Sequence, residues 1–191
     1  LNLFDAYEAR VASLLGAAPR HWLIDKMPLR FLHGGLIQRL LPGARLVFVA
    51  RHPCDVVLSN FMQQYAVNET NIHFDTLEHS VQTYVRLMTL WLKLEQAIEL
   101  PVTTVRYEDL VADMPGALTP VIDALGLDPG TISYDREARL ATRDRVRTSS
   151  YQQVGEPIYT RAAGRWERYE RHLAPWLSAL SPFLERYGYA S

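Results

Sequence analysis

Two short apolar runs, each followed directly by a helical pattern, constrain the fold of this chain most strongly. The first is ARLVFVA at residues 44–50, after which a helix is predicted to begin at Pro53 and to run to about Tyr65. The second is VTTVRY at residues 102–107, followed by EDLVADMPGALTPVIDALGL, which predicts a turn and then a helix. Short apolar runs of this kind are typical of buried strands. Strands that alternate with helices predict an α/β fold, with a parallel β-sheet flanked by helices on both faces.

The rest of the chain continues this alternation, although less clearly. Apolar spacing and breaker residues predict helices at residues 3–16, 31–43 and about 76–100, a short strand at WLIDKMP (residues 22–28), and a final helix from residue 165 that Pro175 and Pro182 interrupt. A length of 191 residues with 48% apolar and 21% charged residues fits one domain with a full core. We therefore expect a single domain over residues 1–191.

The net charge and the cysteine content exclude several classes of function. Twenty basic and twenty-one acidic residues leave a net charge of −1, so the chain as a whole is not built to bind nucleic acid or an anionic membrane. No apolar run approaches the roughly 18 to 20 residues of a membrane span, and Cys54 is the only cysteine. These features favour a cytoplasmic, reducing setting. Because position 1 is Leu, we expect that an upstream segment has been removed or left out.

The stretch RHPCDVVLS at residues 51–59 places a cation and a hydroxyl where a strand gives way to a helix. Ligands of open parallel sheets bind at the carboxyl ends of strands, where helix N-termini present free N–H groups. The predicted helix rises about 9 Å from Pro53 to Ser59, and a side chain as long as Arg51 can lean toward the same side. Arg51 and Ser59 are therefore candidates to clamp a phosphate with a forked guanidinium and a hydroxyl. The alternative is that Arg51 pairs with Asp55 and Ser59 faces water.

RHPCDVVLS is similar to the 3′-phosphate-binding motif of sulfotransferases that use 3′-phosphoadenosine 5′-phosphosulfate (PAPS). Further motifs follow the order of the bacterial and tyrosylprotein-like branch of that family, namely IDKMP, PGARLVFVARHP, VRYEDLV, SSYQQVGEPIY, GRWERYE and a final YGY. The resemblance covers residues 22–189, nearly the whole chain. It implies the P-loop-kinase-like sulfotransferase fold, and it implies that Arg51 and Ser59 bind the 3′-phosphate of the nucleotide.

The resemblance also implies roles for four other residues. Lys26 in DKMP matches the lysine that stabilises the transition state, and Ser150 matches a serine that approaches the sulfuryl group. Tyr107 of the YED motif matches the tyrosine that lies against the adenine, which is a sensible use of an aromatic face. Arg165 matches a basic residue near the 3′-phosphate.

Each of these four residues also has a structural alternative. Lys26 fits a solvated loop position, and Ser150 fits a turn. Tyr107 fits a position against the next helix, with Glu108 and Asp109 as capping residues. Arg165 fits a helix start where it stacks on an aromatic ring.

The chain departs from the family pattern in three places. The family holds the 5′-phosphosulfate with a Gly-rich loop that ends in Gly-Thr-Thr, and no such stretch occurs in these 191 residues. We therefore expect an N-terminally truncated member that lacks the first strand and this loop. The general base has no matching residue, and Asp25 and His33 are candidates by proximity only. Ala162 or Ala163 replaces a family serine before GRW.

The implied function is transfer of a sulfuryl group from PAPS, as co-substrate, to a hydroxyl or amine of a small-molecule, carbohydrate or peptide acceptor. No metal is expected, because no Cys/His cluster with ligand spacing is present. The alternative is a catalytically incompetent domain that binds adenosine 3′,5′-bisphosphate weakly or serves as an interaction module. A nucleotide kinase is excluded by the absence of G-x-x-x-x-G-K-[ST]. The acceptor and the oligomeric state are not determined by the sequence.

Overall fold

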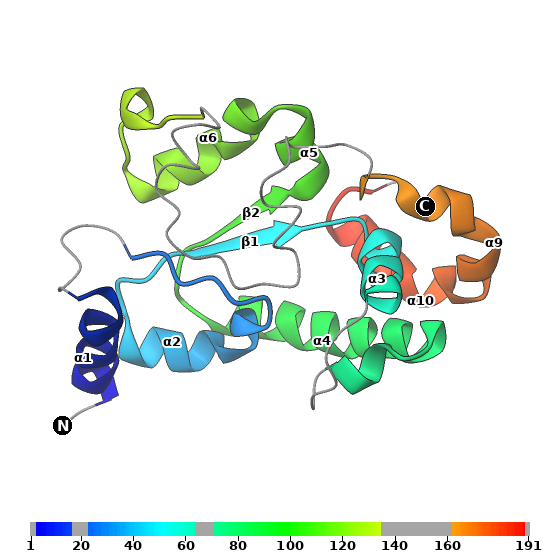
Figure 1. Ribbon diagram of the computed structural model, residues 1–191, viewed down its shortest axis with the longest axis horizontal. Helices are drawn as coiled ribbons and strands as arrows, with labels where there is room; N and C mark the ends of the chain where they lie inside the picture. The colour runs from blue at the N-terminus through cyan, green and yellow to red at the C-terminus, as the bar shows by residue number, and fades with distance from the viewer. Residues whose placement is uncertain (1–2, 17–22, 64–70, 135–161, 190–191) are drawn as a thin grey trace. The chain divides into compact units, whose positions relative to one another are not determined.

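The structure, a computed structural model of the 191-residue chain, describes residues 3–16, 23–63, 71–134 and 162–189. The elements of its first half are α1 (Leu3–Leu15), the 3-10 helix η1 (Arg30–His33), α2 (Gly34–Leu40), β1 (Leu46–Ala50), α3 (Pro53–Met62) and η2 (Asn71–Phe74). Those that follow are α4 (Leu77–Ala97), β2 (Val102–Arg106), α5 (Tyr107–Ala112), α6 (Met114–Leu125), η3 (Pro129–Thr131), η5 (Arg165–Tyr169), α9 (Glu170–Leu173), η6 (Ala174–Trp176) and α10 (Leu177–Arg186) (Figure 1).

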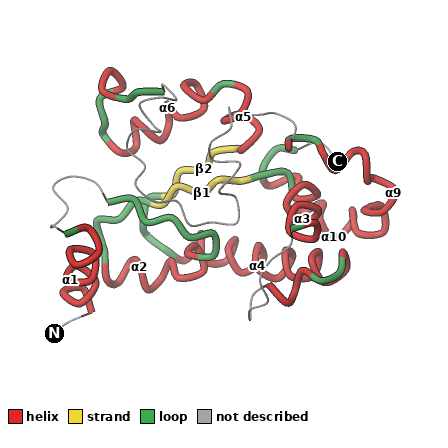
Figure 2. Tube along the Cα trace, in the orientation of Figure 1, coloured by secondary structure: helices red, strands yellow, loops and turns green. Residues whose placement is uncertain are grey.

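The strands β1 and β2 pair in parallel and form a two-stranded sheet (Figure 2). At the start of the pair the Leu46 N–H donates to the Pro101 carbonyl at 2.9 Å. Both strands lie inside the apolar runs that predicted them, and each leads into a helix, α3 or α5. The predicted α/β class with a parallel sheet is therefore confirmed for the described residues, which are mostly helical.

Most of the predicted helices are present. α1 ends before Gly16, whose φ of 72° is a left-handed conformation that suits glycine at a helix end. α4 covers most of the predicted 76–100 helix. The C-terminal helix breaks at η6, which contains Pro175, as expected. The second expected interruption is wrong, because α10 continues through Pro182.

The predicted strand at WLIDKMP is wrong for the part that the structure describes. Residues 23–27 are an irregular stretch, and the Ile24 side chain is 88% exposed. A parallel strand exists only where a neighbour supplies the hydrogen bonds of a ladder, and the described sheet pairs β1 with β2 alone. Without such a neighbour, the apolar sequence of this segment does not produce a strand.

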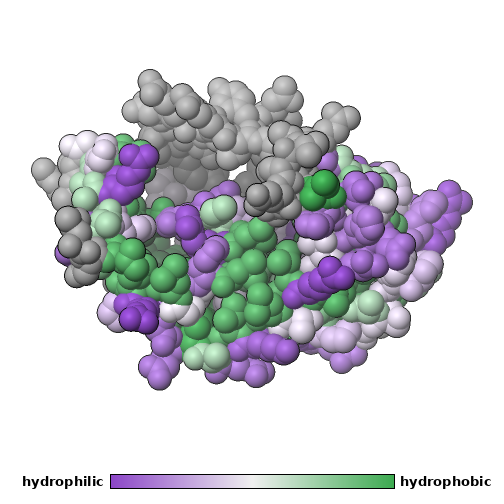
Figure 3. Space-filling view, turned by 90° about the horizontal axis from the view of Figure 1, so that it is seen from below, coloured by the Kyte–Doolittle hydropathy of each residue, from purple (hydrophilic) through white to green (hydrophobic). Residues whose placement is uncertain are grey.

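The chain divides into two compact units. Unit 1 contains Leu1–Leu46 and Thr89–Val102, and unit 2 contains Val47–Met88 and Thr103–Ser191. In unit 1 the Trp91 ring is fully buried and meets the edge of Phe31 at a centroid distance of 5.5 Å. Leu36 and Leu90 of the same unit are exposed, and Figure 3 shows apolar residues at the molecular surface.

Unit 2 has its core between α3, α10 and the first half of α4. Cys54, Val57 and Leu58 of α3 are buried, and so are Leu180, Phe183 and Leu184 of α10. The Tyr84 ring of α4 meets Phe183 edge to face at 5.5 Å. This packing fixes α3 in unit 2, and with it the helix N-terminus that follows β1.

Candidate functional site

The site lies in unit 2 where β1 and β2 end. Arg51 follows β1, and Tyr107 is the first residue of α5 directly after β2. The Arg51 guanidinium carbon lies 4.9 Å from the centroid of the Tyr107 ring, within cation–π range. Because β1 and β2 are parallel neighbours, their carboxyl ends bring these two predicted site residues together.

The Arg51 side chain is half-buried and partly bonded. One terminal nitrogen, Nη2, donates to the Ala162 carbonyl at 2.6 Å. Its Nε is buried and has no hydrogen-bond partner within the described ranges. A buried donor without an acceptor costs about 1–3 kcal/mol. One arm of the guanidinium fork is thus committed to the chain itself, and Nε is a donor that an anionic ligand would satisfy.

Asp55 holds the segment that contains Ala162 and the GRW motif against α3. Its carboxyl is 1% exposed and accepts from the N–H of Gly164 and from the N–H of Trp166, each at 2.8 Å. Burial raises the pKa of Asp55, while these two hydrogen bonds and the nearby charge of Arg51 oppose that rise. The structural alternative was an ion pair between Arg51 and Asp55. The hydrogen bonds of the Asp55 carboxyl are instead those from Gly164 and Trp166.

Arg165 lies between Gly164 and Trp166, the two residues whose N–H groups donate to the Asp55 carboxyl. It begins η5, and its side chain is exposed. Gly164 before it has a φ of 68°, a left-handed conformation that suits glycine. The backbone of Arg165 is therefore fixed on both sides, whereas its charged side chain is accessible to a ligand.

Ser59 lies in α3, four residues after Asp55, and is half-buried. Residues four apart share one side of a helix. Ser59 is therefore one turn further along the side of α3 that faces the Gly164–Trp166 segment, the same side from which Asp55 reaches that segment.

Glu108 is a site residue that the sequence analysis did not identify. It was named only as a capping residue, in the structural alternative for Tyr107. Its Oε1 instead accepts from the His52 N–H at 3.0 Å, and its Oε2 accepts from the Tyr189 hydroxyl at 2.6 Å. Glu108 thus joins the N-terminus of α3 to the YGY segment. One clue to this contact is present in the sequence. Glu108, the predicted helix start at Pro53 and Tyr189 each lie inside a family motif, namely VRYEDLV, RHPCDVVLS and YGY.

Aromatic rings pack around His52, the residue next to Arg51. The Trp166 ring stacks on the His52 imidazole at 4.7 Å with 12° between the planes, and Tyr189 meets it edge-on at 5.1 Å. His52 is 8% exposed. The RHP, GRW and YGY motifs, far apart in the sequence, therefore meet around one imidazole.

The two residues predicted to be catalytic are not among these contacts. Lys26 belongs to unit 1, where it is exposed in the irregular stretch 23–27. Beside it, Asp25 forms an exposed ion pair with Arg30 at 3.5 Å. Ser150 lies outside the described residues. The roles of Lys26 and Ser150 stay predictions.

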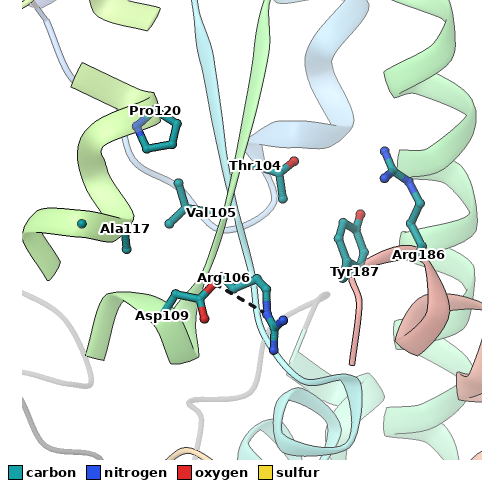
Figure 4. A pocket seen from close by; sticks show the side chains of 9 residues that line it. Thr104, Val105, Arg106, Asp109, Ala117, Pro120, Arg186 and Tyr187 are labelled. Atoms are coloured by element: carbon teal, nitrogen blue, oxygen red, sulfur yellow. Dashed lines mark ion pairs between the residues drawn. The ribbon is translucent and has the colours of Figure 1, made fainter. Parts of the chain in front are cut away.

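An open pocket of about 360 Å³ lies beside β2 (Figure 4). Val105 and Pro120 form part of its wall, and Arg106 pairs with Asp109 at 3.9 Å on its rim. None of the predicted site residues lines it. We assign the candidate site to the strand ends, because the buried donor and the converging motifs are there.

The described part of the chain contains neither a metal-ligand cluster nor a membrane-spanning helix. In residues 3–16, 23–63, 71–134 and 162–189, no group of three or more His, Cys, Asp or Glu side chains is placed to hold a metal ion. Over the same ranges no helix combines the length and the apolar character needed to cross a membrane. The chemistry that the described geometry supports is recognition of an anion next to an aromatic ring.

Comparisons with known proteins agree with this arrangement. An uncharacterized protein from Aquifex aeolicus (strain VF5) is 28% identical over 182 residues, which is 91% of this chain and 22% of that protein. The chain thus spans only about a fifth of the length of this relative. Residues 3–130, more than half of the chain, match the sulfotransferase family. With its parallel strand pair and its RHP and YED motifs inside the matched region, the chain belongs to the sulfotransferase family.

Proposed function

We propose that this chain is a single sulfotransferase domain of the tyrosylprotein-like branch, which binds PAPS and transfers its sulfuryl group to a hydroxyl or amine acceptor. The observation that carries the proposal is the Arg51 guanidinium seated on the Tyr107 ring, with its buried Nε unmatched by any described residue. A cation and an aromatic face side by side suit a nucleotide that bears a phosphate near its base.

Arg51 suits the 3′-phosphate better than a purely structural role. Asp55, in the first turn of the helix that follows Arg51, accepts hydrogen bonds from two backbone N–H groups with its two carboxyl oxygens. The positive charge of Arg51 is therefore available to a ligand, although one Nη is bonded to Ala162. A phosphate at this position distinguishes PAPS from ATP, which has no 3′-phosphate. Arg165 and Ser59 are proposed to supply a second charge and a hydroxyl to the same group.

Lys26 and Ser150 are proposed to act on the sulfuryl group. Sulfuryl transfer, like phosphoryl transfer, asks a protein mainly to align the reacting groups and to neutralise charge on the moving group and the leaving nucleotide. A lysine ammonium and a serine hydroxyl are suitable for both tasks without a metal. The acceptor class, whether small molecule, carbohydrate or peptide, is left open, and we place the reaction in the cytoplasm, where the buried Cys54 stays a thiol.

The experiment that tests nucleotide binding is a calorimetric titration of the chain with adenosine 3′,5′-bisphosphate and, separately, with adenosine 5′-monophosphate. We expect a preference for the bisphosphate. Arg51→Ala should weaken bisphosphate binding by about 10-fold to 100-fold, the equivalent of one lost charged hydrogen bond of about 1.5–3 kcal/mol.

Arg45→Ala is the matched control for Arg51→Ala. Arg45 is exposed and directly precedes β1, so this variant removes one positive charge at the other end of the same strand. It should bind the bisphosphate like the unchanged chain. Equal affinity of the unchanged chain for the two nucleotides, or an Arg51→Ala variant that binds as well as Arg45→Ala, would remove the 3′-phosphate from the proposal.

Turnover is tested separately from binding, in a version of the chain to which the Gly-rich phosphosulfate loop has been restored, with radiolabelled PAPS and a panel of phenol, sugar and peptide acceptors. Lys26→Ala should reduce the rate of transfer by at least about 100-fold, an effect on the order of 3 kcal/mol at the transition state, while the affinity for the bisphosphate changes less than twofold. Equal losses in rate and affinity would make Lys26 a binding residue. Bisphosphate binding without transfer to any acceptor would favour the noncatalytic alternative.

A further inference from the structure

Tyr189 and Glu108 are part of a chain of contacts that ends at the candidate nucleotide site without touching the proposed ligand position directly. Neither residue has a role in ligand binding or catalysis assigned to it above. Glu108 follows Tyr107, and His52, which donates its N–H to Glu108, follows Arg51. The hydrogen bond between His52 and Glu108 therefore links the residue after Arg51 to the residue after Tyr107.

The Tyr189 side chain is held from three directions. Its hydroxyl donates to Glu108 Oε2 at 2.6 Å, its ring meets the His52 imidazole edge-on, and the Arg106 guanidinium lies 4.3 Å from the centroid of its ring. Arg106 also donates to the Gly188 carbonyl at 3.2 Å. A tyrosine that is 8% exposed and held in this way has one orientation, and so does the carboxylate that its hydroxyl engages.

We propose that Tyr189 and Glu108 are positioning residues for recognition of the 3′-phosphate, because they fix the N-terminal turn of α3 and thereby the direction in which Arg51 leaves β1. This inference rests on the proposed function. The hydrogen bond to His52 restrains the backbone immediately after Arg51, and the bond to Tyr189 keeps the carboxylate from turning away. Loss of the hydroxyl frees the carboxylate to rotate and loosens the backbone at His52.

The charge balance of the cluster supports a positioning role over a second ligand-binding role. Burial and the hydrogen bond to Glu108 both raise the pKa of Tyr189, so its hydroxyl stays protonated and stays a donor. Both Glu108 oxygens accept hydrogen bonds from the chain. Both acceptor oxygens of Glu108 are therefore used within the chain, and a carboxylate would repel an anionic ligand instead of binding it.

The test compares Tyr189→Phe with Tyr84→Phe. Both tyrosines are 8% exposed in unit 2, but the Tyr84 ring packs on Phe183 of α10, and the hydroxyl that donates to Glu108 belongs to Tyr189. The readout is the preference for adenosine 3′,5′-bisphosphate over adenosine 5′-monophosphate, measured as a ratio of dissociation constants. A variant that only lowers the folded fraction changes both constants equally and leaves this ratio constant.

We expect Tyr189→Phe to reduce the preference by about fivefold or more, the scale of one hydrogen bond converted to affinity. Tyr84→Phe should leave it within about twofold of the unchanged chain. A preference in Tyr189→Phe equal to that in Tyr84→Phe would overturn the positioning role while the proposed function stands. Absence of any preference in the unchanged chain would instead overturn the proposed function.

A second measurement needs no variant. Amide hydrogen exchange of the unchanged chain should show the His52 N–H protected at least about 10-fold more than the Gly130 N–H, because only the former is buried. The Gly130 N–H is a matched control, since it also donates to a carboxylate, Asp128 Oδ1, at 2.9 Å in an exposed turn. Equal exchange of the two amides would show that Glu108 does not hold the turn and would overturn the inference without reference to any nucleotide.

Discussion

The residues that follow β1 and the stretch 23–28 were both expected to be strand ends that carry a cation, yet they differ in almost every physical respect. After β1, Pro53, Cys54 and Asp55 are buried and Arg51 is bonded to distant parts of the chain. Around Lys26, the neighbouring side chains Ile24 and Met27 are exposed. The difference teaches that an apolar run with a cation at its end becomes a positioned site only where another strand and a helix supply partners.

The largest expected effect concerns the better-packed region. Asp55→Ala leaves the N–H groups of Gly164 and Trp166 without their buried acceptor. We expect the free energy of unfolding to fall by about 3 kcal/mol, measured by urea denaturation.

Asp113→Ala is the control for this change. Asp113 also accepts a backbone N–H, that of Gly116, at 3.2 Å, but as an exposed N-cap of α6. Its loss should cost only about 1 kcal/mol. Equal losses in the free energy of unfolding for Asp55→Ala and Asp113→Ala would mean that burial of the Asp55 hydrogen bonds adds nothing to their contribution to stability.

The next effect sharpens the comparison at the ligand level. Tyr107→Leu keeps an apolar side chain but removes the ring under Arg51. Binding of adenosine 3′,5′-bisphosphate should weaken by about 1 kcal/mol, or roughly fivefold, from lost stacking and cation–π interaction. Calorimetry measures this change, and an unaltered dissociation constant would separate Tyr107 from the base.

A smaller effect is the pH dependence that Asp55 contributes. Burial raises the pKa of Asp55 in the folded state above its ordinary value of 3.8. At pH values between 3.8 and the folded-state pKa, the folded chain therefore binds more protons than the unfolded chain. This contribution to stability is complete below pH 3.8 and is lost as pH rises through the folded-state pKa. The stability advantage of the unchanged chain over Asp55→Asn should therefore shrink as pH rises from about 3.8.

Urea denaturation at several pH values measures this advantage. The side-chain amide of the Asn variant does not titrate in this range, so the difference between the two chains isolates Asp55. An advantage that grows with pH would mean that the hydrogen bonds from Gly164 and Trp166 and the charge of Arg51 outweigh burial.

The smallest effect is expected at the exposed stretch. Ile24→Ala should change the free energy of unfolding by less than about 0.5 kcal/mol, because the side chain is already 88% exposed. Val57→Ala in α3, where the side chain is 1% exposed, should cost about 2 kcal/mol in the same assay. A cost at Ile24 comparable to that at Val57 would show that the stretch is packed in solution and would remove the contrast.

Local sequence signals predicted the fold where the chain itself supplies the partners. β1, β2 and α3 follow from short apolar runs and from Pro53 at a helix start, because those signals act within a few residues. The strand at residues 22–28 failed because strand formation depends on a neighbour that a local pattern does not contain. Pro182 was expected to interrupt a helix, but α10 buries Leu180, Phe183 and Leu184, and that packing favours a continuous helix.

The sequence indicated which residues gather at the candidate site, but not how they are connected. Arg51 and Tyr107 were selected because they lie at two strand ends inside motifs that resemble those of sulfotransferases, and the structure brings the two side chains together. Their roles in binding stay predictions. The contacts of Asp55 with Gly164 and of Glu108 with Tyr189 join segments that no spacing rule relates. Such bonds depend on the tertiary packing of unit 2, so the sequence order of the motifs indicated a site without showing how it is held.

The hydrogen bonds of this site also bear on the time at which it forms. Those from Arg51 to Ala162 and from Trp166 to Asp55 each join residues 111 positions apart, and that from Tyr189 to Glu108 spans 81. Contacts between distant residues carry a large loop-closure cost and form late in folding. During synthesis the β1–α3 junction emerges early but stays incomplete until residues 162–189 have left the ribosome. Acquisition of the proposed nucleotide affinity should therefore mark the last stage of folding of unit 2, after its helices have formed.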